Sequence, residues 1–301
     1  MRTEYSFKIW GGSLANIDSD FNLGVKLAND GSYRKALNVF KLILKRNPED
    51  VQSKLYLGQI HSKLGFPEKA IKVYSDIILT DPSNIKARIN AAALYGKIGE
   101  FENAITHYKA ALNYKTDYFE AILGLAIAFA KIGDHSQAIK FYERAIQIQP
   151  DNATVHNYFG KTLAETGRDK DAMNSFQRAI ELDPSYGEAY YNLAVAYGHK
   201  EKHELVIEYC QKAIEHNMPD REKAYCNLAI ALNESGDRSG ALQSLKKALK
   251  INPDFTEARY NLGVVHVTNN DKKSALAEYR VLNKIDKARA IRLHKIITEH
   301  F

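Results

Sequence analysis

Hydrophobic positions along the chain form pairs of helical stripes that repeat every 34 residues. In residues 51–84, one stripe runs from Leu55 to Leu64 and a second from Ala70 to Ile78, each at the spacing of a single helix face. Gly65 follows the first stripe and Pro82 the second, where such residues end helices. The pattern predicts two helices in each repeat, joined by short turns.

Small and aromatic residues keep the same period, which favours close helix packing between stacked repeats rather than one closed core. Small residues fall in the middle of each first helix, at Gly24, Gly58, Ala92, Ala126, Gly160, Ala194, Ala229 and Gly263. Aromatic residues that would fill the space between repeats are Phe40, Tyr74, Tyr108, Tyr142, Phe176 and Tyr279. A leucine at one of the small positions is expected to overpack the contact by roughly 1–3 kcal/mol.

This combination, with Leu57-Gly58, Gly65, Ala70, Tyr74 and Pro82 in one repeat, resembles the tetratricopeptide repeat. The resemblance covers eight copies from Ile17 to about Arg289. It implies an all-α, right-handed α-solenoid of helix-turn-helix repeats, with a concave face lined by the first helices and a C-terminal capping helix. The expected organisation is an N-terminal aromatic arm in 1–16, the repeats in 17–289 and the remainder of the capping helix, which begins near 285, in 290–301.

The two ends differ from the repeats. Tyr5, Phe7 and Trp10 in the arm lack helical spacing, so the arm is expected to cap the first helix, enter the groove or contact a partner. The C-terminal segment is expected to form an amphipathic helix that packs with Ile285, Leu293, Ile296, Ile297 and Phe301.

The sixth repeat departs most from the pattern. Glu201 replaces the turn glycine, Val206 the alanine and Cys210 the aromatic residue, and one residue is inserted near Met218. These changes indicate either drift in a tolerant loop or a local change of superhelical pitch.

Charge and cysteine content exclude several classes of protein. The formal net charge is +6 with a pI near 9.0, but basic and acidic residues are interspersed, so no nucleic-acid partner is indicated. The RNA-reading pentatricopeptide repeats typically run 35 residues, a length that only the sixth repeat has.

Two lone thiols, Cys210 and Cys226, fit a reducing compartment. The sequence lacks a signal-like start and a membrane-spanning stretch, which predicts a cytoplasmic protein without membrane insertion.

Catalytic chemistry is not predicted, because no phosphate-binding loop, nucleophile elbow or paired-cysteine motif is present. His199 and His203 share helical spacing but straddle a predicted turn, which argues against a metal site. No cofactor, metal or enzymatic activity is expected.

The sixth residue of the repeat is the strongest candidate for binding. Asparagine occupies it at Asn22, Asn90, Asn192, Asn227 and Asn261. Such side chains can pair with a peptide backbone in the groove, or they can tie neighbouring helices together. The run resembles the asparagine ladder in the repeat domain of O-linked N-acetylglucosamine transferases, which implies an extended peptide ligand.

The fifth residue changes character along the chain. It is apolar at Phe21, Leu55, Ile89 and Leu123, then changes to Asn157, Tyr191, Cys226 and Tyr260. The first four predict either an apolar strip in the groove or packing between first helices, and Tyr191 and Tyr260 are expected to stack on partner side chains. Lys63, Lys97 and Lys131 end three first helices, either to complement the helix dipole or as a basic rail.

These features favour a non-catalytic scaffold or adaptor that binds a peptide segment of a partner protein in the concave groove. A carboxylate clamp for heat-shock chaperones is not expected, because its lysine slot holds Phe21, Leu55, Ile89 and Leu123. The alternative is the regulatory repeat domain of a glycosyltransferase-like enzyme. Residues 1–301 contain no glycosyltransferase domain after the repeats, so that alternative requires a separate catalytic partner or a truncated chain.

Overall fold

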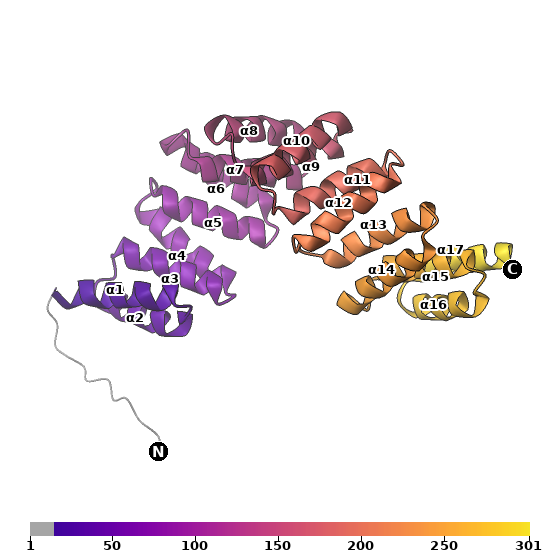
Figure 1. The fold of residues 1–301 in the computed structure, drawn as a ribbon. Helices are drawn as coiled ribbons and strands as arrows, with labels where there is room; N and C mark the ends of the chain where they lie inside the picture. Colours follow the sequence, from indigo (N-terminus) through magenta and orange to yellow (C-terminus); the bar gives the residue numbers. More distant parts are fainter. Residues whose placement is uncertain (1–14) are drawn as a thin grey trace, which may run out of the picture. The chain divides into compact units, whose positions relative to one another are not determined.

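The computed structural model describes residues 15–301, which form seventeen α-helices and no strand (Figure 1). This confirms the predicted all-α repeat fold and the predicted number of helices. The helices are α1 (Ala15–Asn29), α2 (Tyr33–Arg46), α3 (Val51–Lys63), α4 (Pro67–Thr80), α5 (Ile85–Lys97), α6 (Phe101–Tyr114), α7 (Phe119–Lys131), α8 (His135–Ile148), α9 (Ala153–Glu165), α10 (Asp169–Leu182), α11 (Gly187–Gly198), α12 (His203–Glu215), α13 (Arg221–Glu234), α14 (Arg238–Ile251), α15 (Thr256–Thr268), α16 (Lys272–Ile285) and α17 (Lys287–His300).

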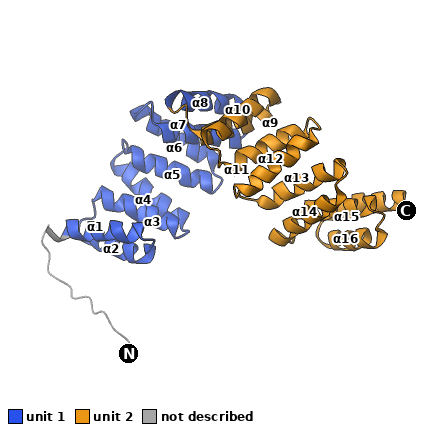
Figure 2. Ribbon diagram, viewed as in Figure 1, with its two compact units in different colours: residues 1–148 blue, residues 149–301 orange. Residues whose placement is uncertain are grey.

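The helices divide between two compact units, residues 1–148 and residues 149–301 (Figure 2). Within each unit the odd-numbered first helices contact one another in sequence, and each second helix packs on the first helix of its own repeat. This arrangement gives each unit one layer of first helices and one layer of second helices. The predicted arm around Trp10 lies outside the described residues.

Helix ends follow from local chemistry. The Asp50 side chain accepts a hydrogen bond from the backbone N–H of Ser53 at 3.2 Å, which caps the start of α3. Gly65 adopts a φ of +82°, a left-handed conformation that glycine takes at no steric cost, and so lets the chain turn into α4. Pro67 is the first residue of α4, where its missing N–H has no helical partner to lose.

Small residues allow the two layers to pack closely, as predicted. A Cβ atom built on Gly58 would lie 2.6 Å from the Tyr74 ring, and one on Gly24 would lie 2.8 Å from the Phe40 ring. Tyr74 and Phe40 are fully buried. A glycine in the first helix therefore leaves the space that an aromatic ring of the second helix fills.

The capping helix α17 packs on α15 and α16 at the place where another repeat would begin. Leu293 and Ile297 are buried, and Leu293 lies against Gly263. The prediction that Ile285 packs as part of the capping helix is wrong. Asp286 caps the start of α17, so Ile285 is the last residue of α16, where it is exposed. Phe301 is also exposed.

The sixth repeat keeps the helical hairpin without its turn glycine. Glu201 adopts a φ of +55°, the left-handed conformation that glycine adopts in six other turns and that Asn270 adopts, at +58°, in the eighth repeat; the six glycines are Gly31, Gly65, Gly99, Gly133, Gly167 and Gly236. Cys210 is fully buried in the aromatic slot, and burial raises the pKa of its thiol to about 12, so it is a core residue.

Glu201→Gly is expected to raise the free energy of unfolding by about 0.5–1 kcal/mol, because a side chain with Cβ is strained in the left-handed region. Urea denaturation followed by circular dichroism measures the change. Gly167→Ala is the matched control and should lower stability by a similar amount. A less stable Glu201→Gly protein would show that the turn is held by contacts of the glutamate.

A buried histidine makes the stability of residues 15–148 depend on pH. Burial, with smaller contributions from Lys41 and Lys69, lowers the pKa of His61 below 6.5, and its Nδ1 has no hydrogen-bond partner in the described residues. The unfolded chain therefore takes up a proton at a higher pH than the folded chain does. The stability that folding gains from the neutral His61 side chain is therefore present above about pH 6.5, the unfolded-state pKa, and is lost as the pH falls from there towards the lower, folded-state pKa.

The urea midpoint of the wild type is expected to be lower at about pH 5.5 than at about pH 7.5. His61→Gln should reduce this difference, whereas exposed His199→Gln should leave it unchanged. Burial also lowers the pKa of His107, so some dependence on pH should remain in the His61 variant. Equal pH dependence in wild type and His61→Gln would assign the effect to other groups.

Candidate functional site: an asparagine ladder on the first helices

In residues 149–301, three hydrogen bonds between the fifth and sixth positions of neighbouring repeats join consecutive first helices. Nδ2 of Asn192 on α11 donates to Oδ1 of Asn157 on α9 at 2.8 Å. Nδ2 of Asn227 on α13 donates to the hydroxyl of Tyr191 at 3.3 Å, and Nδ2 of Asn261 on α15 lies 3.2 Å from Sγ of Cys226. In each bond the sixth residue of one repeat donates to the fifth residue of the repeat before it. We call these three bonds the rungs.

The acceptors of the rungs are neutral at physiological pH. Burial raises the pKa of Tyr191 to about 12 and that of Cys226 to about 12. Asn157 is fully buried, and its own Nδ2 donates to the hydroxyl of Tyr186 at 3.1 Å. An amide group has two N–H donors and one carbonyl oxygen, so a rung uses one donor and leaves the second N–H and Oδ1 for a ligand.

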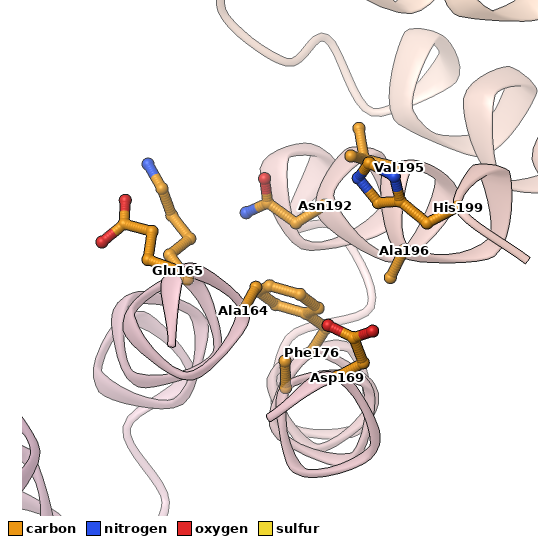
Figure 3. Close-up of a pocket in the computed structure, with 10 residues that line it drawn as sticks. Ala164, Glu165, Asp169, Phe176, Asn192, Val195, Ala196 and His199 are labelled. Carbon is orange, nitrogen blue, oxygen red and sulfur yellow. The ribbon is translucent and has the colours of Figure 1, made fainter. Parts of the chain in front are cut away.

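Two adjoining clefts open beside two of the rungs, those of Asn192 and Asn227. The first, about 200 Å³, lies between α9, α10 and α11, and Asn192, Val195, His199 and Phe176 line it (Figure 3). The second, about 270 Å³, lies between α11, α12 and α13 and contains Asn227. Val195 and His199 of α11 and its C-terminal end line both clefts, so the two clefts lie next to each other on either side of these residues. Figure 3 shows the Asn192 amide extending from α11 over the Phe176 ring towards α9.

The same positions are arranged differently in residues 15–148. The Asn90 side chain is hydrogen-bonded to Tyr74 of the second helix before it, and Asn22 is exposed. Leu55 is only 5% exposed and belongs to the core around Tyr74, so the predicted apolar strip is interrupted there. Phe21 packs edge-on against Phe40 and Tyr56.

The remaining predicted site residues fall into two groups. Ile89, Leu123 and Tyr260 are half-buried, and Tyr260 packs against the core under the capping helix. Lys63, Lys97 and Lys131 are exposed at the ends of their helices. The described residues contain no group of three or more histidine, cysteine or acidic side chains that could hold a metal ion.

Sequence reasoning located the ladder asparagines but missed the residues that position them. The change of character at Asn157 and Cys226 predicts no contact with the asparagines, and Tyr191 is expected to stack on a partner side chain rather than to accept a hydrogen bond from Asn227. The signal was present, because the fifth residue becomes polar in the repeats that precede Asn192, Asn227 and Asn261. Phe176 belongs to the periodic aromatic series and His199 shares helical spacing with His203, but neither pattern predicts a cleft.

Comparison with protein families gives one consistent result. A family model described as TPR repeat matches residues 160–200 and 231–270. Models described as tetratricopeptide repeat match residues 21–85, 99–158 and 187–217. Together these ranges span well over half of the chain. No curated protein matches the chain in a sequence comparison.

Solved structures share the fold. A chain of the APC/C hetero-tetramer Cut9-Hcn1 matches with a TM-score of 0.67 and 16% identity over 88% of this chain, which spans 52% of that chain. A tetratricopeptide repeat protein from Parabacteroides merdae matches with a TM-score of 0.67 and 16% identity, covering 83% of this chain and 99% of its own. MamA matches with a TM-score of 0.50 and 26% identity over 54% of this chain and 94% of MamA.

No helix in residues 15–301 combines the length and the hydrophobicity that crossing a membrane requires.

Proposed function

Because the chain belongs to the tetratricopeptide repeat family, we propose that it is a non-catalytic scaffold whose first-helix face holds an extended segment of a partner protein. The observation that supports this most strongly is the set of rungs. Each rung fixes the orientation of one amide and leaves its carbonyl oxygen and second N–H for a ligand, and two of these amides, Asn192 and Asn227, line the clefts.

The spacing of the rungs suits a peptide backbone. Packed helix axes lie about 8–10 Å apart, and an extended chain advances about 3.3 Å per residue. Successive amides of the ladder therefore meet backbone groups about three residues apart. Side chains of the segment enter the clefts over Phe176 and Val195, and the ladder itself reads main-chain groups, which makes this unit tolerant of partner sequence.

The test uses peptides selected from a display library on the wild-type protein, with affinities measured by fluorescence anisotropy. The triple variant Asn192→Ala, Asn227→Ala, Asn261→Ala should bind them roughly a hundredfold more weakly, at about 1 kcal/mol for each lost hydrogen bond. The matched control is Asn38→Ala, Asn113→Ala, Asn174→Ala, which removes three exposed asparagines from second helices and should bind as the wild type does.

Backbone recognition is tested separately with peptides that are N-methylated at every third residue. N-methylation should weaken binding to the wild type and have little further effect on the ladder variant, because both changes remove the same bonds. If the selected peptides keep their affinity for the folded ladder variant, the first-helix face of residues 149–301 is not the binding site.

A further inference from the structure

Three consecutive first helices in residues 15–148 end in an exposed lysine. Lys63 ends α3, Lys97 ends α5 and Lys131 ends α7. None of the three forms an ion pair within the described part of the chain. Ile98 and Ile132, which follow two of these lysines, are 37% and 41% exposed. We call Lys63, Lys97 and Lys131 the basic edge.

Helix stability does not account for the basic edge. A cation near a helix C-terminus is favourable because it complements the helix dipole. However, the equivalent position in residues 149–301 holds a carboxylate at the end of two helices, Glu165 on α9 and Glu234 on α13. Since these first helices form with the opposite charge at their last residue, the fold does not require lysine there.

The geometry of the basic edge suits an extended anionic chain. α3 contacts α5 and α5 contacts α7, so successive lysines are carried by helices about 8–10 Å apart. That distance is about three residues of an extended peptide. A cleft of about 480 Å³ between α1, α2 and α3 reaches Lys63 and is lined by Tyr33, Tyr56 and Ile60. One end of the edge therefore adjoins a recess with aromatic walls.

We propose that the basic edge binds an extended acidic segment of a partner protein that carries a carboxylate at every third residue. Apolar residues between the carboxylates contact Ile98 and Ile132, and a large apolar side chain at one end enters the cleft beside Lys63. The proposal rests on the proposed function, because it takes the first helices as the binding surface, but it uses a different set of residues.

The probe is a fluorescein-labelled peptide of about twelve residues with glutamate at every third position, isoleucine or serine between, and one terminal phenylalanine. The wild-type protein should bind it several-fold more tightly than a peptide of the same composition with contiguous glutamates. The affinity should fall when salt is raised from about 0.05 M to about 0.3 M, because exposed charges are screened. No binding up to about 1 mM peptide would overturn the proposal.

The variant Lys63→Gln, Lys97→Gln, Lys131→Gln should weaken binding roughly tenfold, from about 0.5 kcal/mol for each exposed ion pair. The control variant Lys35→Gln, Lys72→Gln, Lys140→Gln removes the same charge from exposed positions on second helices and should bind normally. Equal losses in the two variants would assign binding to net charge and overturn the proposal. The proposal would also be overturned if an equally charged single-stranded oligonucleotide bound more tightly than the peptide and its binding depended on the same lysines.

The asparagine variant separates this proposal from the proposed function. If the ladder variant of residues 149–301 keeps full affinity for the acidic probe, the basic edge acts as its own site. If the ladder fails its own test and the acidic probe still depends on Lys63, Lys97 and Lys131, the edge proposal stands alone.

Discussion

Tyr74→Ala is expected to lower the free energy of unfolding by about 3–5 kcal/mol. Tyr74 is 1% exposed, and its ring occupies the space above Gly58. Its hydroxyl is hydrogen-bonded to Asn90 of the next repeat, so alanine leaves both a cavity and an unpaired amide. Urea denaturation followed by circular dichroism measures the loss. Leu79→Ala on the same helix removes a side chain that is 83% exposed and should change stability by less than about 0.5 kcal/mol.

The loss should be local to neighbouring repeats. Repeats in a solenoid contact only their neighbours, so hydrogen exchange should accelerate in α3, α4 and α5 well before it does in the helices of residues 149–301. Uniform acceleration along the chain would show that the repeats unfold as one cooperative block. A stability loss below about 1 kcal/mol would mean that the surrounding side chains move in and fill the cavity left by the ring.

Asn157→Leu is expected to lower the free energy of unfolding by about 1–3 kcal/mol, because it keeps the volume of a fully buried side chain and removes its polar atoms. The Asn192 amide loses its acceptor and the Tyr186 hydroxyl loses its donor. With no rung to hold it, the Asn192 amide rotates freely, and peptide affinity should fall although Asn192 is still present.

A double variant distinguishes packing from positioning. Asn157→Leu combined with Asn192→Leu replaces both partners with apolar groups, which should recover part of the stability. Peptide affinity should stay low, because no amide remains at that rung. Tyr186→Phe removes only the hydroxyl that accepts a hydrogen bond from Asn157, so of these variants it should weaken peptide binding least. If Asn157→Leu binds peptides as the wild type does, Asn157 serves packing alone.

Periodicity was enough to predict the helices, their ends and the close contact at Gly58, because these depend on residues within one repeat. The site was less predictable because it depends on residues one repeat apart. Asn192 and Asn157 are 35 positions apart, and their contact follows only from stacking. Burial at the fifth position also varies with the neighbouring repeat, so Leu55 and Cys226 are buried while Ile89 is half-exposed.

The direction of the rungs has a consequence for how such a chain changes over evolutionary time. Each sixth-position amide donates towards the N-terminus, to an acceptor at the fifth position of the preceding repeat. A duplicated sixth or seventh repeat brings both a donor and an acceptor, so the duplication lengthens the ladder without leaving an unpaired group. A copy of the repeat at 51–84 inserted there would place Leu55 at the fifth position and Tyr56 at the sixth. It would bring neither an amide donor nor a polar acceptor and would interrupt the ladder. Gene duplication within 187–255 can therefore extend the ladder in steps of one repeat, whereas exchange between the two units cannot.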